Sequence, residues 1–149
     1  MKLFKYLLFI ALFAGISVPL LTSCSNDDDE ASPIEGYWYE IDEGDDPVNY
    51  AMWVFKNGKY ASVYTYKSYI TKSELKEYVD EAFRSNKVSN SSVYIKGKGT
   101  YTLKGKKLKV TDGYVDYFYV AFQKSNSVMV WEGEDPEEGR IYLQRYTEE

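Results

Sequence analysis

The sequence predicts an all-β fold, an antiparallel meander of about eight strands closed as a barrel, with one inserted helix near residues 72–86. Short segments rich in Tyr, Val, Ile and Trp alternate with turn residues along most of the chain. Tight turns join neighbouring segments and make them antiparallel. One stretch alone repeats its apolar residues at helical spacing. A sandwich shares this local pattern, so it stays open beside the barrel.

Eight segments have the composition of strands and are bounded by turn residues. They are 36–41, 50–55, 59–66, 92–103, 107–111, 114–122, 127–132 and 139–146. Asn57-Gly58 separates the second strand from the third, because this dipeptide favours the positive φ angles of a type I′ turn. Lys104-Gly105 and Asp112-Gly113 mark two further tight turns.

One helix is expected between the third and fourth strands. Thr71 and Glu74 have the spacing of a capping box, with Thr71 as the N-cap. Apolar residues then recur at helical spacing, namely Leu75, Tyr78, Val79, Ala82 and Phe83. This apolar stripe must rest on the sheet or lie across an open end of the barrel and close it.

Strict alternation assigns the faces of the strands. In 92–103 it predicts an inward set of Val93, Ile95, Gly97, Gly99, Tyr101 and Leu103. The two glycines on that face allow the sharp bend that a barrel corner requires. An inward Trp38 also turns Glu40 inward unless a bulge intervenes. In the last strand Arg145 shares the apolar face, a placement that needs an explanation.

The N-terminus has the features of an export signal over residues 1–23. Lys2 and Lys5 make its start positive, and the apolar run that follows, 6–21, is short for a membrane-spanning helix. An acidic tether at 24–33 and a β domain at 34–149 complete the expected organisation. This length suits one ordinary domain and is too short for two.

The tetrapeptide Leu21-Thr22-Ser23-Cys24 resembles the lipobox of bacterial lipoproteins, and Cys24 is the sole cysteine. The resemblance implies cleavage before Cys24 and lipidation of its sulfur with fatty-acid chains such as palmitate, which anchor stably when two or more are present. The acidic run 27–30 is similar to the surface-export signal of some outer-membrane lipoproteins. We therefore expect an outer-membrane protein that is lipid-anchored and exposed on the cell surface. An ordinary cleaved signal before a solvated acidic tether is the alternative.

The composition disfavours most enzymes. There is no histidine, so a Ser-His or Cys-His pair and a histidine metal ligand are excluded. We expect no catalytic residue, no metal and no cofactor, although carboxylate-only chemistry stays formally open. The net charge of −5 argues against a nucleic-acid partner. Acidic clusters at 42–46 and 132–138 lack the spacing of known calcium loops and are expected to be solvated.

Gly36-Tyr37-Trp38 opens the first strand, and Arg145 lies in the last. This pattern resembles that of the lipocalins, in particular the lipocalin-like domains of small bacterial surface lipoproteins. The resemblance implies that Arg145 packs across Trp38 and closes the barrel, a contact worth about 1–2 kcal/mol. One departure is that the main helix of a lipocalin follows the barrel, whereas this helix interrupts it.

The chain holds sixteen tyrosines and three tryptophans, residue types that suit ligand pockets and interfaces. The candidate ligand-binding residues are Trp53, Tyr64, Tyr66, Tyr101, Tyr119 and Trp131. We expect a non-enzymatic binding protein that holds a small apolar or amphipathic ligand in a barrel. The alternative is an accessory lipoprotein that binds glycans or proteins through exposed aromatic side chains. Equally, most of these rings can be core residues.

Overall fold

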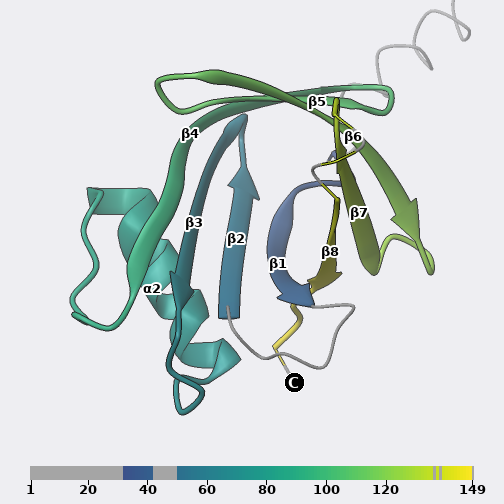
Figure 1. The fold of residues 1–149 in the computed structure, drawn as a ribbon. Helices are drawn as coiled ribbons and strands as arrows, with labels where there is room; N and C mark the ends of the chain where they lie inside the picture. The colour runs from purple at the N-terminus through teal and green to yellow at the C-terminus, as the bar shows by residue number, and fades with distance from the viewer. Residues whose placement is uncertain (1–31, 42–49, 136, 138, 149) are drawn as a thin grey trace, which may run out of the picture. The chain divides into compact units, whose positions relative to one another are not determined.

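In the part of the chain that the structure describes, eight antiparallel strands follow one another around a closed barrel, and the first pairs with the last (Figure 1). The strands are β1 (Gly36–Ile41), β2 (Tyr50–Lys56), β3 (Lys59–Thr65), β4 (Tyr94–Lys104), β5 (Lys107–Thr111), β6 (Val115–Gln123), β7 (Val128–Gly133) and β8 (Arg140–Arg145). The helix α2 (Lys72–Ser85) lies between β3 and β4. The predicted fold class is therefore confirmed, and the strand ends differ from the predicted ones by two residues at most.

This computed structural model describes residues 32–41, 50–135, 137 and 139–148. The expected export signal at 1–23, the lipidation site Cys24 and the acidic tether up to residue 31 lie outside the described residues, as does the acidic cluster 42–46. Residues 33–149 make up one unit of the chain. In the described part, no helix is long and apolar enough to cross a membrane.

The tight turns between strands follow from their sequences. Asn57 and Gly58 both have positive φ angles, of 52° and 73°, as a type I′ hairpin requires. Gly105 takes φ 59° between β4 and β5. These turns lie at one end of the barrel, here called the base, where β2, β4 and β6 finish. The opposite end, where β1, β3, β5 and β7 finish, is called the mouth.

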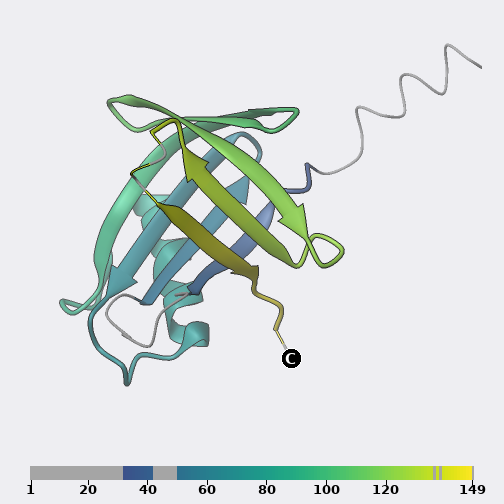
Figure 2. The ribbon, with the colours of Figure 1, turned by 45° about the vertical axis from the view of Figure 1, so that its right-hand side comes forward.

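Helix α2 packs on the outside of the barrel, against β2, β3 and β4 (Figures 1 and 2). The predicted capping box is present: Thr71 accepts from the Glu74 N–H at 3.2 Å, and Glu74 accepts from the Thr71 N–H at 2.7 Å. The apolar stripe of α2 packs against the outer face of these strands and forms a second core with them. Its buried members are Met52, Val54, Ala61, Val63, Ile70, Leu75, Val79, Ala82 and Val93. The idea that this helix closes one end of the barrel is therefore wrong.

The inside of the barrel holds the main core. Its buried members are Ile34, Trp38, Trp53, Phe55, Tyr60, Tyr101, Leu108, Val110, Val120, Met129, Trp131 and Leu143. The largest fully buried side chains include Trp38, Phe55 and Leu143, which fill the inner face toward the base. Inward apolar residues alternate with outward ones along the strands, and outward residues of β2 and β3 such as Met52 and Val63 are apolar too because α2 covers them. Burial of the inner face favours the register observed.

A bulge in β4 corrects one predicted face. Opposite the step from Ser62 to Val63, the pairing skips Lys96, so that Gly97 and Ile95 are the paired residues. Beyond this extra residue the alternation reverses. Val93 and Ile95 therefore face α2 and not the interior, and the inward assignment of these two residues was wrong. The extra residue, Lys96, turns inward toward Trp53.

Candidate functional site

The two ends of the strand order meet at Trp38 and Arg145, which are paired across β1 and β8. The guanidinium carbon of Arg145 lies 4.3 Å from the centroid of the Trp38 ring. Its N–H groups donate to backbone oxygens of Pro33, Glu35 and Asn126 at 2.6, 2.7 and 3.1 Å. A Cβ on Gly36 would lie 2.9 Å from the Arg145 Nη1, which gives the glycine of the Gly-x-Trp pattern a steric reason. This contact closes the base.

The structure places the six candidate ligand-binding residues in three locations. Trp53 and Trp131 lie on the inner face at the middle of the barrel, Tyr64 lies on the same face nearer the mouth, and Tyr66 follows Tyr64 at the rim. Tyr101 lies on the inner face toward the base, where its hydroxyl donates to Oε1 of Glu35 at 3.4 Å. Tyr119 lies on the outer face of β6 and is exposed. Four of the six candidates therefore belong to one site.

Three tyrosines form the rim of the mouth. Tyr64 pairs with Tyr94 across β3 and β4, and their ring centroids are 5.4 Å apart. Tyr66 meets the Tyr64 ring edge-on, also at 5.4 Å. A hydrogen bond with Tyr66 raises the pKa of the Tyr64 phenol. Tyr66 and Tyr94 are exposed, so the rim presents aromatic faces to solvent with hydroxyls beside them.

An ion pair lies on the inner face just below this rim. The Nζ of Lys96 is 3.1 Å from Oε2 of Glu40, and it lies 5.4 Å from the centroid of the Trp53 ring. Glu40 is inward because β1 has no bulge between Trp38 and Glu40 in its pairing with β8. The bulge at Lys96 supplies the matching cation. This arrangement gives the mouth one fixed charge of each sign.

Three buried polar atoms at the same level lack a hydrogen-bond partner among the described residues: Nε1 of Trp53, Oγ of Ser62 and Nε1 of Trp131. Trp53 and Ser62 are cross-strand partners, and the Trp53 and Trp131 ring centroids are 5.0 Å apart. The three groups thus lie close together on the inner face. Leaving a buried donor unbonded costs about 1–3 kcal/mol, so such groups call for acceptors.

Below these groups the barrel is filled. Phe55 stacks near Trp53 with centroids 6.2 Å apart and meets Tyr101 edge-on at 5.1 Å. Trp38 of the neighbouring strand β1 and Phe122 of β6 have ring centroids 6.2 Å apart. A ligand at the mouth therefore meets a solid aromatic floor, and a pocket running through the whole barrel is excluded by these side chains.

Tyr60 ties the start of β3 to the turn between β5 and β6. Its hydroxyl donates to Oδ2 of Asp112, in the turn between β5 and β6, at 3.1 Å. Burial, together with the charge of Asp112, raises the pKa of the Tyr60 phenol. The phenol is therefore a neutral donor at physiological pH and positions the β5–β6 turn.

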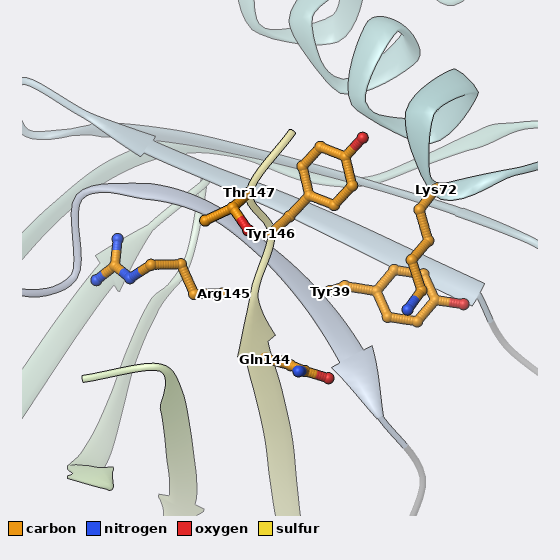
Figure 3. Close-up of a pocket in the computed structure, with 6 residues that line it drawn as sticks. All are labelled: Tyr39, Lys72, Gln144, Arg145, Tyr146 and Thr147. Atoms are coloured by element: carbon orange, nitrogen blue, oxygen red, sulfur yellow. The ribbon is translucent and has the colours of Figure 1, made fainter. Parts of the chain in front are cut away.

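A shallow groove of about 380 Å³ lies on the outer surface, between the paired residues Tyr39 of β1 and Gln144 of β8 and the first turn of α2 (Figure 3). Its residues are Tyr39, Lys72, Gln144, Arg145, Tyr146 and Thr147. The Lys72 Nζ lies 4.5 Å from the centroid of the Tyr39 ring. The Arg145 side chain points away from the others in Figure 3. The backbone N–H of Tyr146 donates to the backbone oxygen of Tyr37 at 2.9 Å, and this bond holds the C-terminal segment against β1.

Acidic side chains gather near the β7–β8 connection but form no metal cluster. A groove of about 230 Å³ there is lined by Val115, Asp116, Tyr117, Phe118, Glu134 and Asp135. In the described ranges, no group of three or more His, Cys, Asp or Glu side chains is arranged to hold a metal ion. Glu134 instead pairs with Lys107, at 3.0 Å.

Sequence reasoning missed Glu40, Ser62, Tyr94 and Lys96 as members of the mouth. Glu40 had a usable signal, because its spacing from Trp38 already turns it inward. Lys96 and Tyr94 had no such sequence signal, because strict alternation predicts that both side chains point outward. Only the bulge turns them inward. No protein-family model, curated protein or solved structure matches this chain.

Proposed function

We propose that this protein is a lipid-anchored protein of the outer cell surface that binds a small amphipathic molecule at the mouth of its barrel and catalyses no reaction. The observation that supports the proposal best is a group of buried polar atoms, on Trp53, Ser62 and Trp131, that have no hydrogen-bond partner among the described residues. Two buried indole N–H groups and a hydroxyl on the inner face, beneath a rim of tyrosines, suit a ligand that brings oxygen acceptors.

The surroundings of these donors define the ligand further. The aromatic rim of Tyr64, Tyr66 and Tyr94 offers ring faces to an apolar or planar part of the ligand. The filled floor limits how deep that part can enter, so a long extended acyl chain does not fit inside the barrel. A compact molecule with one apolar face and several oxygen atoms matches both features.

The ion pair of Glu40 and Lys96 gives the mouth its polarity. An acceptor on the ligand can lie near the Lys96 ammonium, which already packs against the Trp53 ring. The chain has no histidine, so the groups at the mouth that acid–base chemistry could use are the carboxylate of Glu40, the ammonium of Lys96 and the phenols of the rim. Glu40 is paired with a cation, which suits a binding role better than a catalytic one.

The ligand proposal is tested on the full chain purified in mild detergent from its own cells. Solvent extraction and mass spectrometry of the wild-type chain are expected to yield one amphipathic compound in near-stoichiometric amount. The double variant Trp53→Phe, Trp131→Phe keeps the aromatic floor and removes both indole donors. It is expected to retain at least tenfold less of the compound.

Tyr101→Phe is the matched control, because Tyr101 also lies on the inner face but toward the base. It is expected to retain the compound as the wild type does. Titration with 1-anilinonaphthalene-8-sulfonate, an amphipathic probe with oxygen acceptors, supplies a second measurement through tryptophan fluorescence. The proposal fails if the wild-type extract is empty and the probe does not bind, or if the double variant retains as much compound as the wild type.

The proposed anchor has its own test. Cells that express the wild-type chain are grown with labelled palmitate, and label is expected on this protein but not on Cys24→Ser. Protease added to intact cells is expected to digest the anchored domain, as surface exposure requires. Neutralising the acidic run 27–30 to alanine is expected to leave the protein lipidated but protected. Unlabelled wild-type protein would refute the anchor.

A further inference from the structure

The exposed large apolar side chains are not spread evenly over the barrel. Four of them lie on β6 and the turn before it: Tyr114, Val115, Tyr117 and Tyr119, with exposed fractions of 82, 49, 38 and 49%. We call this group the tyrosine face. Helix α2 covers β2, β3 and β4, so it leaves β6 open on its outer side (Figure 2).

The two central rings are presented as a row. Tyr117 and Tyr119 alternate with the inward Phe118, so both lie on the outer side of β6, about 7 Å apart along the strand. Lys107 pairs with Tyr119, and its Nζ lies 4.6 and 6.0 Å from the centroids of Tyr117 and Tyr119. One ammonium thus packs on both rings and holds them in place.

Charged groups frame this row and neutralise one another. Lys107 is itself held by Glu134, with Nζ 3.0 Å from Oε1. On the next strands Arg140 lies 3.4 Å from Glu132, the cross-strand partner of Tyr119. Lys109, the cross-strand partner of Tyr117, and Asp135, beside Glu134, add one further charge of each sign. The face therefore offers many hydrogen-bond donors and acceptors around aromatic rings without an excess of either sign. A strongly charged partner has nothing to complement here.

The size of the face also limits its partner. With roughly 200 Å² for a fully exposed tyrosine, the four side chains expose about 400 Å². A stable protein interface buries about 800 Å² on each partner, twice that area. A patch of about 400 Å² is instead within the range that is often functional on a monomer. A narrow ligand that lies along one strand fits it better.

We propose that the tyrosine face binds a neutral carbohydrate chain that lies along β6. A sugar ring has an apolar C–H face, which packs on a tyrosine ring, and an edge of hydroxyls, which hydrogen-bonds to the paired charges. A row of rings along an extended strand matches a linear chain of sugars. This site is on the outside of the barrel and is independent of the mouth.

The test uses native gel electrophoresis of the full chain in nonionic detergent, with soluble polysaccharide cast into the gel. The neutral probes are xyloglucan, mixed-linkage glucan, galactomannan and dextran, and polygalacturonate is the acidic probe. At least one neutral probe is expected to retard the wild-type chain. The double variant Tyr117→Ala, Tyr119→Ala is expected to weaken that binding at least tenfold.

Tyr69→Ala is the matched control, because Tyr69 is 70% exposed and lies in the connection before α2. It is expected to bind as the wild type does, and circular dichroism checks that all variants are folded. Retardation by no neutral probe, retardation by polygalacturonate alone, or unchanged binding by the double variant would overturn the proposal. A dimeric wild type together with a monomeric double variant would also overturn it, because the face would then bind a second copy of the chain. The mouth ligand should remain bound in the double variant, so this test and that of the mouth can fail separately.

Discussion

The guanidinium carbon of Arg145 lies 4.3 Å from the centroid of the Trp38 ring. Three nitrogens of the same group donate to backbone oxygens, two of them in the segment before β1 and one in the β6–β7 turn. One side chain near the C-terminus therefore holds both the first strand and the segment before it. Burial lowers the pKa of Arg145, but the guanidinium keeps its charge at any physiological pH. The contact is a structural clasp at the base, on the opposite side from the mouth.

Replacing this clasp is expected to cost much of the stability of the barrel. Arg145→Ala removes three hydrogen bonds from a charged donor and the ring contact, so we expect a loss of about 3 kcal/mol or more in the free energy of unfolding. Arg145→Lys is expected to recover only part of that free energy, because an ammonium lacks the planar set of N–H donors that a guanidinium offers. Urea unfolding measures both. Arg140→Ala breaks an exposed ion pair and is expected to change stability by less than about 0.5 kcal/mol. Equal losses at Arg145 and Arg140 would contradict the clasp.

The two glycines of β4 are expected to differ in their tolerance of a methyl group. A Cβ on Gly99 would lie 1.8 Å from the backbone oxygen of Thr111, which cannot move without breaking the β4–β5 pairing. Gly99→Ala is therefore expected to cost about 3 kcal/mol or to prevent folding. A Cβ on Gly97 would meet only side-chain atoms of Asp112 and Tyr60 at 3.3 Å, and about 1 kcal/mol is expected. Thermal unfolding of the two variants compares them, and a Gly97 variant that is the less stable would refute this reasoning.

The sequence predicted the architecture well because local signals control it. Asn57-Gly58 and Gly105 determine where strands turn, and Thr71 determines where α2 begins. Such signals act over a few residues and can be read without the rest of the fold. They were enough to predict the strand ends and the antiparallel order, but a sandwich shares them, and the lipocalin resemblance of Trp38 and Arg145 favoured the barrel.

The candidate site was predicted only in part, because its pairings are long-range. Glu40 and Lys96 are 56 positions apart, and their contact depends on a bulge that no local pattern marks. Tyr101 and Tyr119 looked like the other candidates in composition. Their places followed from register alone: Tyr101 points inward near the base, and Tyr119 points outward.

Tyr37 is expected to make the stability of the protein depend on alkaline pH. Burial and the hydrogen bond that its hydroxyl donates to Oδ1 of Asp80, at 2.6 Å, raise its pKa to about 12. The unfolded chain loses this proton near pH 10, so the stabilisation is complete below about pH 10 and disappears as the pH rises to about 12. Because Tyr37 is partly exposed, we expect a contribution of about 1 kcal/mol.

Tyr37→Phe isolates that contribution from the other tyrosines. At about pH 8 the variant is expected to be less stable than the wild type by about 1 kcal/mol, because Asp80 loses a donor. The difference should shrink as the pH rises above about 10, although both proteins lose stability there. The urea unfolding midpoints of both proteins, measured at several pH values from about 8 to about 12, give this difference in stability. A difference that stays constant with pH would show that the phenol proton is not involved.

Trp38 and Trp131 are expected to respond differently to replacement by phenylalanine. Nε1 of Trp38 donates to the backbone oxygen of Ile34 at 2.7 Å, whereas Nε1 of Trp131 lacks an acceptor among the described residues. Trp38→Phe therefore loses packing and leaves a buried oxygen unpaired, and should cost about 3 kcal/mol or more. Trp131→Phe loses some packing but also removes the cost of an unbonded donor. In protein stripped of small molecules its stability should lie within about 1 kcal/mol of the wild type.

The same pair of variants separates a ligand from the polypeptide as the source of the missing acceptor. If the bound molecule supplies it, the wild type should gain thermal stability when the extracted compound is added back, whereas Trp131→Phe should gain much less. Trp38→Phe is altered at the base and starts from a lower melting temperature. The added compound should raise that temperature by as much as it does for the wild type. A Trp131→Phe variant as damaged as Trp38→Phe in stripped protein would mean that the chain itself bonds this indole. The mouth would then lose the feature that most favours a ligand there.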